Sequence, residues 1–179
     1  MSVQNNRMTM ALETALEMEV EGKKFYQKAG QKSITALAQE VFKHLAAEEE
    51  VHHKKVTEVY KELTAGKAWP TKESALEHKK HMKVIEQLVK DAMEKMDISF
   101  QAPASEIEAL KVGMSMEDKS YTLYRNLERD SESPAERAFF KALTGEERVH
   151  YLTLQSSHEF LLNPQGWFTM KERWSLDGM

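Results

Sequence analysis

The second half of the chain repeats the first half. Residues 11–63 and 109–161 align without a gap at a constant offset of 98, and 14 of the 53 aligned residues are identical. Two unrelated segments of average composition would share about three residues over this length. A repeat of this size predicts two copies of one structural unit that bury a common core between them.

Each copy has the composition and spacing expected of a helical hairpin. The 179 residues include only seven glycines and four prolines and are rich in Glu, Lys, Ala, Leu and Met, which favour long helices. Apolar residues recur at near-helical spacing along the first helix of the first copy: Leu12, Leu16, Val20 and Phe25. We predict helices over residues 9–29 and 34–65 in the first copy and over residues 106–129 and 134–162 in the second.

Capping signals mark the predicted helix starts. Ser33 is placed to cap the helix over residues 34–65. Residues 105–108 and 133–136 both have the form S-x-x-E, in which the serine and glutamate side chains satisfy backbone N–H groups at the helix start. In the second of these, Pro134 occupies the first helical position, where its missing N–H needs no partner. The signal before Pro134 is therefore the stronger of the two.

A long connection joins the two copies. It spans residues 66–104 and contains a predicted crossover helix over residues 72–96, with Pro70 and Pro103 as breakers on either side. A connection of this length frees the second hairpin from the directional constraint of a short loop. With 41% hydrophobic residues the chain can bury one sizeable core. We predict an all-α four-helix bundle over residues 1–163, followed by an aromatic tail over residues 164–179.

Charge and composition exclude several classes of function. The 29 acidic and 25 basic residues are interspersed and give a net charge of −4, so we expect no nucleic-acid partner. The chain has no cysteine, which excludes disulfides, iron–sulfur clusters and thiol nucleophiles within it. It also lacks a secretory signal near Met1 and the roughly 18-residue apolar run of a membrane span. We expect a soluble, cytoplasmic protein with no membrane partner.

The identities between the copies include polar residues with metal-ligand spacing. Polar positions on an exposed helix face would drift between copies, so their identity indicates a function. In Glu49-x-x-His52 the carboxylate and imidazole are three residues apart and project from one helix face, about 5–6 Å apart at Cβ. The repeat supplies the same pair again and adds one glutamate from each remaining helix. The candidate metal ligands are Glu19, Glu49, His52, Glu117, Glu147 and His150.

Mixed carboxylate and imidazole ligation suits iron or manganese. The alternative for these six residues is a solvated or salt-bridged helix face. One Glu from each of two helices and Glu-x-x-His from each of the other two is the ligand set of ferritin-like di-metal carboxylate proteins. The stretches ALEME at 15–19, FY at 25–26 and LAAEEEVH at 45–52 resemble the rubrerythrin family, and the resemblance covers nearly the whole chain.

The resemblance implies a ferritin-like bundle that binds two iron ions, with manganese or a mixed metal pair as alternatives. It implies that Glu49 and Glu147 bridge the metals. It pairs Glu19 with His52 on one metal and Glu117 with His150 on the other. Tyr26 and Tyr124 would donate hydrogen bonds to the ligands. Members of the family usually carry a second Glu one turn from the ligand at Glu117, where this chain has Met114 and Ser120.

The activity implied by the resemblance is reduction of hydrogen peroxide to water. Without cysteines the chain cannot build a rubredoxin-type iron site, so the electrons would come from an external donor such as a rubredoxin-like protein. We expect a homodimer or a higher homo-oligomer. Two alternatives use the same ligands: ferritin-like iron oxidation by oxygen or peroxide with storage or buffering, and a non-catalytic metal-binding bundle.

The remaining histidines are expected to be unrelated to this centre. Three of them have no partner in the repeat and are predicted to lie at the surface: His44, His53 and His158. In the crossover, Glu77, His78 and His81 share helical spacing. They lie among lysines, which disfavours a second metal site there.

Overall fold

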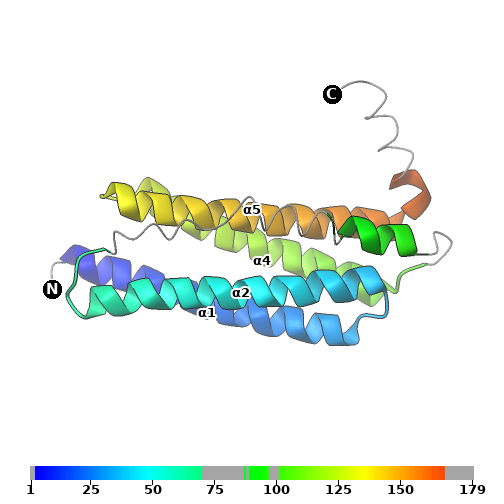
Figure 1. The fold of residues 1–179 in the computed structure, drawn as a ribbon, viewed down its shortest axis with the longest axis horizontal. Coiled ribbons are helices and arrows are strands. Elements are labelled where there is room, and N and C mark those ends of the chain that lie inside the picture. Colours follow the sequence, from blue (N-terminus) through cyan, green and yellow to red (C-terminus); the bar gives the residue numbers. More distant parts are fainter. Residues whose placement is uncertain (1–2, 70–86, 88, 97–100, 168–179) are drawn as a thin grey trace, which may run out of the picture.

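The computed structural model describes residues 3–69, 87, 89–96 and 101–167 (Figure 1). These residues form four long helices: α1 (Val3–Lys32), α2 (Ala36–Thr64), α4 (Ala104–Arg129) and α5 (Pro134–Leu162). No strand occurs among them. The predicted all-α helical bundle is confirmed. None of the described helices has an apolar stretch long enough to cross a membrane.

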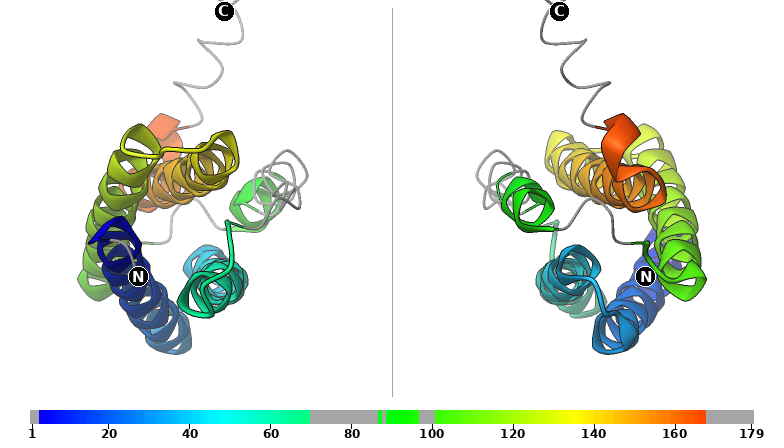
Figure 2. Two further views of the ribbon diagram at one scale, coloured as in Figure 1. Left: turned by 90° about the vertical axis from the view of Figure 1, so that its left-hand side faces the viewer. Right: turned by 90° about the vertical axis from the view of Figure 1, so that its right-hand side faces the viewer.

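The four helices form two hairpins that pack side by side. The most extensive contacts are α1 with α2 and α4 with α5, and the hairpins meet through α1 with α4 and α2 with α5. Figure 1 shows that α4 runs parallel to α2 and antiparallel to α1, and Figure 2 shows all four around a common axis. A salt bridge of 3.4 Å between Arg7 and Asp130 accordingly joins the start of α1 to the end of α4. Equivalent midpoints of the two copies therefore face each other.

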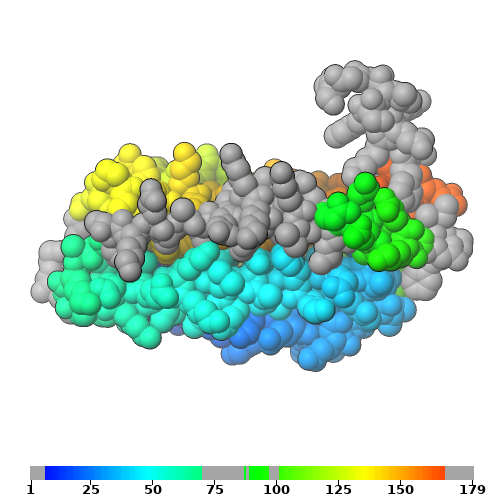
Figure 3. Space-filling view, viewed as in Figure 1, coloured from blue at the N-terminus to red at the C-terminus, as the bar shows by residue number. Residues whose placement is uncertain are grey.

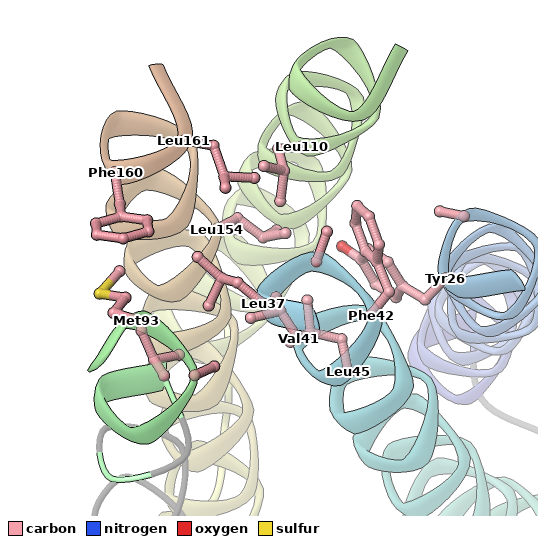
Figure 4. Packing of buried hydrophobic residues seen from close by; sticks show 14 of the residues in the cluster. Tyr26, Leu37, Val41, Phe42, Leu45, Met93, Leu110, Leu154, Phe160 and Leu161 are labelled. Carbon is pink, nitrogen blue, oxygen red and sulfur yellow. The ribbon is translucent and has the colours of Figure 1, made fainter. Parts of the chain in front are cut away.

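Part of the predicted crossover helix lies within the described residues. Residues 87 and 89–95 are helical, and Val89, Ala92 and Met93 are buried against the core. Figure 3 shows this segment over the seam between α2 and α5, and Figure 4 shows Met93 beside Phe160. The rest of the predicted helix over 72–96 lies outside the described residues, as do Glu77, His78 and His81.

Two apolar clusters fill the bundle, one toward each end. The first includes Tyr26, Phe42 and Leu45 and is shown in Figure 4. The second contains their repeat equivalents, which are Tyr124, Phe140 and Leu143. On every helix the candidate ligands lie between the residues of one cluster and those of the other. The polar centre is therefore sealed along the bundle axis by apolar side chains.

The helix caps agree with the sequence at one end and differ at another. Ser133 accepts a hydrogen bond of 3.1 Å from the Glu136 N–H, so this predicted cap is confirmed. The predicted cap at Ser33 is wrong, because α1 continues through Lys32 and the Ser33 hydroxyl donates back to the Ala29 carbonyl at 2.9 Å. Thr35 caps α2 instead, where its hydroxyl accepts from the Ala38 N–H at 3.2 Å.

The predicted capping box at residues 105–108 is also wrong. Helix α4 begins at Ala104, after Pro103, and has no side-chain cap. Glu106 is only 3% exposed and turns toward the loop between α1 and α2. Its carboxylate accepts from the Thr35 hydroxyl at 2.6 Å, from the Thr35 N–H at 3.1 Å and from the Ile34 N–H. Three donors on a neighbouring loop hold this glutamate more effectively than its own helix start.

The helix ends differ from the predicted bounds where the sequence lacks a clear signal. Helix α1 begins at Val3 and not at residue 9, since no Gly or Pro interrupts residues 3–8. Helix α5 ends at Leu162, and residues 164–167 form a further helical turn. Trp167 of this turn packs edge-on against Phe160, with ring centroids 5.6 Å apart. The remainder of the predicted aromatic tail lies outside the described residues.

Candidate metal centre

The structure brings all six candidate ligands together in the middle of the bundle. Each residue is at most 5% exposed: Glu19 from α1, Glu49 and His52 from α2, Glu117 from α4, and Glu147 and His150 from α5. The four residues of the two Glu-x-x-His pairs each offer one potential ligand atom, and these four atoms all lie within 4.8 Å of one another. The antiparallel pairing of α1 with α4 places their two glutamates on either side of this group.

Glu147 lies between the two imidazoles. One of its carboxylate oxygens, Oε1, is 3.2 Å from His52 Nδ1. The other, Oε2, is 3.5 Å from His150 Nδ1. The two imidazole rings are nearly parallel, with centroids 5.3 Å apart and an interplanar angle of 20°. One carboxylate therefore faces two nitrogen donors with one oxygen each, which is the arrangement of a bridging ligand.

Each imidazole also has a carboxylate from the other helix of its hairpin nearby. His52 Nδ1 lies 3.4 Å from Glu19 Oε2. His150 Nδ1 lies 3.5 Å from Glu117 Oε2, and 3.7 Å from Glu49 Oε1 of the other hairpin. These distances define two half-sites, one around His52 and one around His150. The pairs match those that the family resemblance implies, and the metal-ligand roles themselves stay predictions.

The buried donor atoms fit a pair of cations. Four of the six candidate ligands present atoms that are buried and have no hydrogen-bond partner: Glu19 Oε2, His52 Nδ1, both oxygens of Glu147 and His150 Nδ1. A buried polar atom without a partner costs about 1–3 kcal/mol. Each of these atoms lies 3.2–3.5 Å from another of them, so positive ions bound between them would satisfy them together. Oxygen and imidazole donors in this mixture suit iron or manganese.

Protons take the place of cations when no metal is bound. Burial, followed by repulsion from Glu19, raises the pKa of Glu49 well above its usual range. Burial and the charge of Glu147 raise the pKa of Glu117 to about 8. Burial would lower the pKa of His150, but Glu117 and Glu147 outweigh it and raise the value to about 10. Metal binding at this centre must therefore displace protons.

Two buried tyrosines hold the carboxylates of Glu19 and Glu117 in place. The Tyr26 hydroxyl on α1 donates to Glu117 Oε1 on α4, and the Tyr124 hydroxyl on α4 donates to Glu19 Oε1 on α1. Burial, then the nearby carboxylates, raise the pKa of both phenols well above the usual value, so both stay protonated donors. Each tyrosine fixes one carboxylate oxygen and leaves the other oxygen directed toward an imidazole.

Comparison with known families decides the kind of protein. The family model described as Rubrerythrin matches residues 11–157, which include both Glu-x-x-His pairs and both tyrosines. The chain belongs to the rubrerythrin family. Members of this family bind a di-iron centre. Comparisons with curated proteins and with solved structures gave no match.

This rubrerythrin has two further carboxylates that the sequence reasoning left without a role. Glu146 Oε2 lies 2.6 Å from His52 Nε2, on the side of the ring away from the centre. Despite burial, the hydrogen bond with His52 lowers the pKa of Glu146, so the group is a carboxylate acceptor. With Nε2 held as the donor, Nδ1 is the nitrogen that faces the centre and would bind a metal there after losing its proton. The repeat could have indicated a role for these two residues, because Glu48 and Glu146 are identical at the offset of 98, and both are buried in the structure.

The three other histidines among the described residues, which are His44, His53 and His158, are half-buried and so less exposed than the prediction of surface residues implies. His44 Nε2 lies 3.8 Å from Glu48 Oε1, one turn away on α2. Burial lowers the pKa of His158, and Lys111 adds to the effect. None of the three lies within the group of six ligands.

Proposed function

We propose that this chain binds two iron ions between the six residues and reduces hydrogen peroxide to water with electrons from an external redox protein. The observation that carries this proposal is the set of buried, unpartnered donor atoms arranged as two half-sites joined by Glu147. When bound, the iron pair would supply the two electrons that break the O–O bond. One peroxide, two electrons and two protons then give two waters.

The protein's own contribution is to position the ligands and to manage protons and water. The hydroxyls of Tyr26 and Tyr124 hold the carboxylates of Glu117 and Glu19 from opposite helices. The two apolar clusters exclude bulk water along the bundle axis, which strengthens the electrostatic interactions within the centre. Glu49 and Glu117 border a pocket that reaches the centre from solvent, so they are placed to take up the protons.

The electrons must come from a separate protein. A rubredoxin-type iron site needs four thiolates, and this chain has no cysteine. A small redox protein of the rubredoxin class is the donor that we propose. The turnover experiment tests whether such a donor reaches the centre, because a donor that cannot reach it gives no turnover.

The test is anaerobic iron loading followed by one equivalent of hydrogen peroxide. The expected result is two irons retained per chain, consumption of one peroxide per iron pair, and repeated turnover when reductant and a rubredoxin are added. Rapid oxidation by dioxygen with growth of a ferric mineral would favour iron storage instead. Two tightly held irons with no reaction toward either oxidant would favour the non-catalytic bundle.

A further inference from the structure

A pocket between α1 and α4 connects the surface with the candidate metal centre. Its volume is about 280 Å³. The exposed side chains of Glu21 and Lys119 line its outer end, and the buried carboxylates of Glu49 and Glu117 line its inner end. The phenol ring of Tyr26 forms part of the wall. A molecule that enters here reaches a ligand carboxylate without crossing either apolar cluster.

Small residues at one repeat position leave this space open. Gly22 on α1 and Ser120 on α4 are equivalent in the repeat, and both line the pocket. A Cβ atom at Gly22 would lie 3.1 Å from Glu49 Oε2, so a larger residue there would press on the carboxylate. Met18 and Met116, which are also repeat equivalents, border the same opening from the two helices. The pocket therefore follows from the way in which the two copies meet.

The pocket reaches only one of the two half-sites. Of the six candidate ligands, Glu49 and Glu117 line the pocket, whereas Glu19, His52, Glu147 and His150 do not. Tyr26 lines it and the equivalent Tyr124 does not. On the opposite side of the bundle, residues 89–96 of the crossover cover part of the seam between α2 and α5 (Figure 2). The half-site of Glu117 and His150 is thus the open one among the described residues.

We propose that this pocket is the access path for a small uncharged oxidant, and that the oxidant meets the centre at the half-site of Glu117 and His150. This inference rests on the proposed function, in which the oxidant is hydrogen peroxide. The space is that of several water molecules, since one water occupies about 30 Å³ in the liquid. Glu21 and Lys119 give the outer end opposite charges, which favours a neutral molecule over an ion.

The test measures nitric oxide binding to the anaerobic diferrous protein, because nitric oxide is small, uncharged and detected without turnover. Ser120→Phe fills the pocket and should lower the second-order binding rate constant at least tenfold. Ser115→Phe makes the same change at an exposed position of α4 outside the pocket and should leave the rate unchanged. Met116→Ala widens the opening and should raise the rate.

Iron content and helix content are measured for each variant. Wild-type nitric oxide kinetics in an iron-loaded Ser120→Phe protein would overturn the proposal, as would a Met116→Ala protein that is no faster than wild type. If Ser120→Phe does not retain iron, Ser120→Leu and Met116→Ala decide the question by their opposite effects. Altered binding rates without peroxide turnover in the wild type would reject the proposed function alone. Normal peroxide turnover by the wild type, together with nitric oxide binding rates that the pocket variants leave unaltered, would reject the proposed role of the pocket alone.

Discussion

At the scale of single residues, the centre depends on one carboxylate that faces two imidazoles. Glu147 is fully buried, and its oxygens lie 3.2 and 3.5 Å from His52 Nδ1 and His150 Nδ1. Burial would raise its pKa, but the charge of His52 and the nearby imidazole of His150 lower it, so it is ionised without metal. It is the residue whose charge the two half-sites share.

Glu147→Gln should therefore reduce bound iron to fewer than two ions per chain. The amide keeps the shape of the side chain but removes the charge and one acceptor oxygen. Helix content should change little, because the apolar clusters supply most of the folding free energy. Metal analysis after anaerobic loading measures the effect, with Glu159→Gln at an exposed position of α5 as the control. Full iron content in the Glu147 variant would contradict the assignment.

Glu146 should act by orienting His52 and not as a ligand. Loss of the carboxylate in Glu146→Gln should weaken metal binding about 10- to 100-fold, the range for residues that hold a metal-ligating histidine. Cobalt titration measures the affinity, and proton NMR of the cobalt protein follows the Nε2–H of His52. Glu146→Asp, which keeps the charge, should recover part of the affinity. An unchanged Nε2–H resonance in Glu146→Gln would reject this role.

The metal-free protein should lose stability as pH rises. The pKa of Glu117 is about 8 in the folded chain against 4.5 in the unfolded one, and that of His150 is about 10 against 6.5. Between pH 4.5 and about 8 for Glu117, and between pH 6.5 and about 10 for His150, the folded state keeps a proton that the unfolded state releases. The free energy of unfolding should fall by about 1.4 kcal/mol per pH unit for each group. Urea unfolding of metal-free protein at pH 6, 7, 8 and 9 tests this.

Metal loading should counteract this loss of stability at higher pH. Iron requires deprotonated ligands, so its affinity increases over the pH range in which the metal-free protein weakens. The difference in free energy of unfolding between loaded and metal-free protein should grow steadily from pH 6 to pH 9. A metal-free protein whose stability stays constant or rises over that range would show that Glu117 and His150 do not retain their protons.

At the scale of helices, Glu106 links α4 to the start of α2. Glu106→Ala removes the acceptor for the Thr35 hydroxyl and the N–H groups of Thr35 and Ile34. The expected loss is about 2 kcal/mol of unfolding free energy, since buried donors left without a partner cost about 1–3 kcal/mol. Chemical denaturation measures it. Glu108→Ala, at an exposed position of the same helix, should change stability by less than about 0.5 kcal/mol.

The helix starts show where local sequence patterns predict a cap correctly and where they fail. At Ser133 the hydroxyl accepts from the Glu136 N–H, and the Glu136 carboxylate accepts from the Glu132 N–H just before the cap, so all the partners belong to the same turn. The serine at 105 follows the same pattern, yet α4 begins at Ala104, two residues before the predicted start, and Glu106 binds another loop. That contact joins residues 71 apart in the chain. A local pattern contains no information about a donor that arrives through tertiary packing.

At the scale of the whole molecule, the repeat made the fold and the six clustered residues predictable. The constant offset of 98 pairs Glu19 with Glu117 and His52 with His150 from the amino-acid sequence alone. The long crossover left the direction of the second hairpin free, and α4 runs parallel to α2. The pocket at Ser120 was not predictable, because its volume depends on how far apart the backbones of α1 and α4 lie. The role of Glu146 could have been inferred from its identity with Glu48.

The most direct test of the central claim is a crystal structure of the anaerobically iron-loaded protein with anomalous diffraction at the iron edge. We expect two anomalous peaks per chain, one beside His52 and one beside His150, with Glu147 between them. The two peaks should account for all iron bound in solution. No peak at this position, a single peak shared by all six residues, or two peaks held by other side chains would contradict the account.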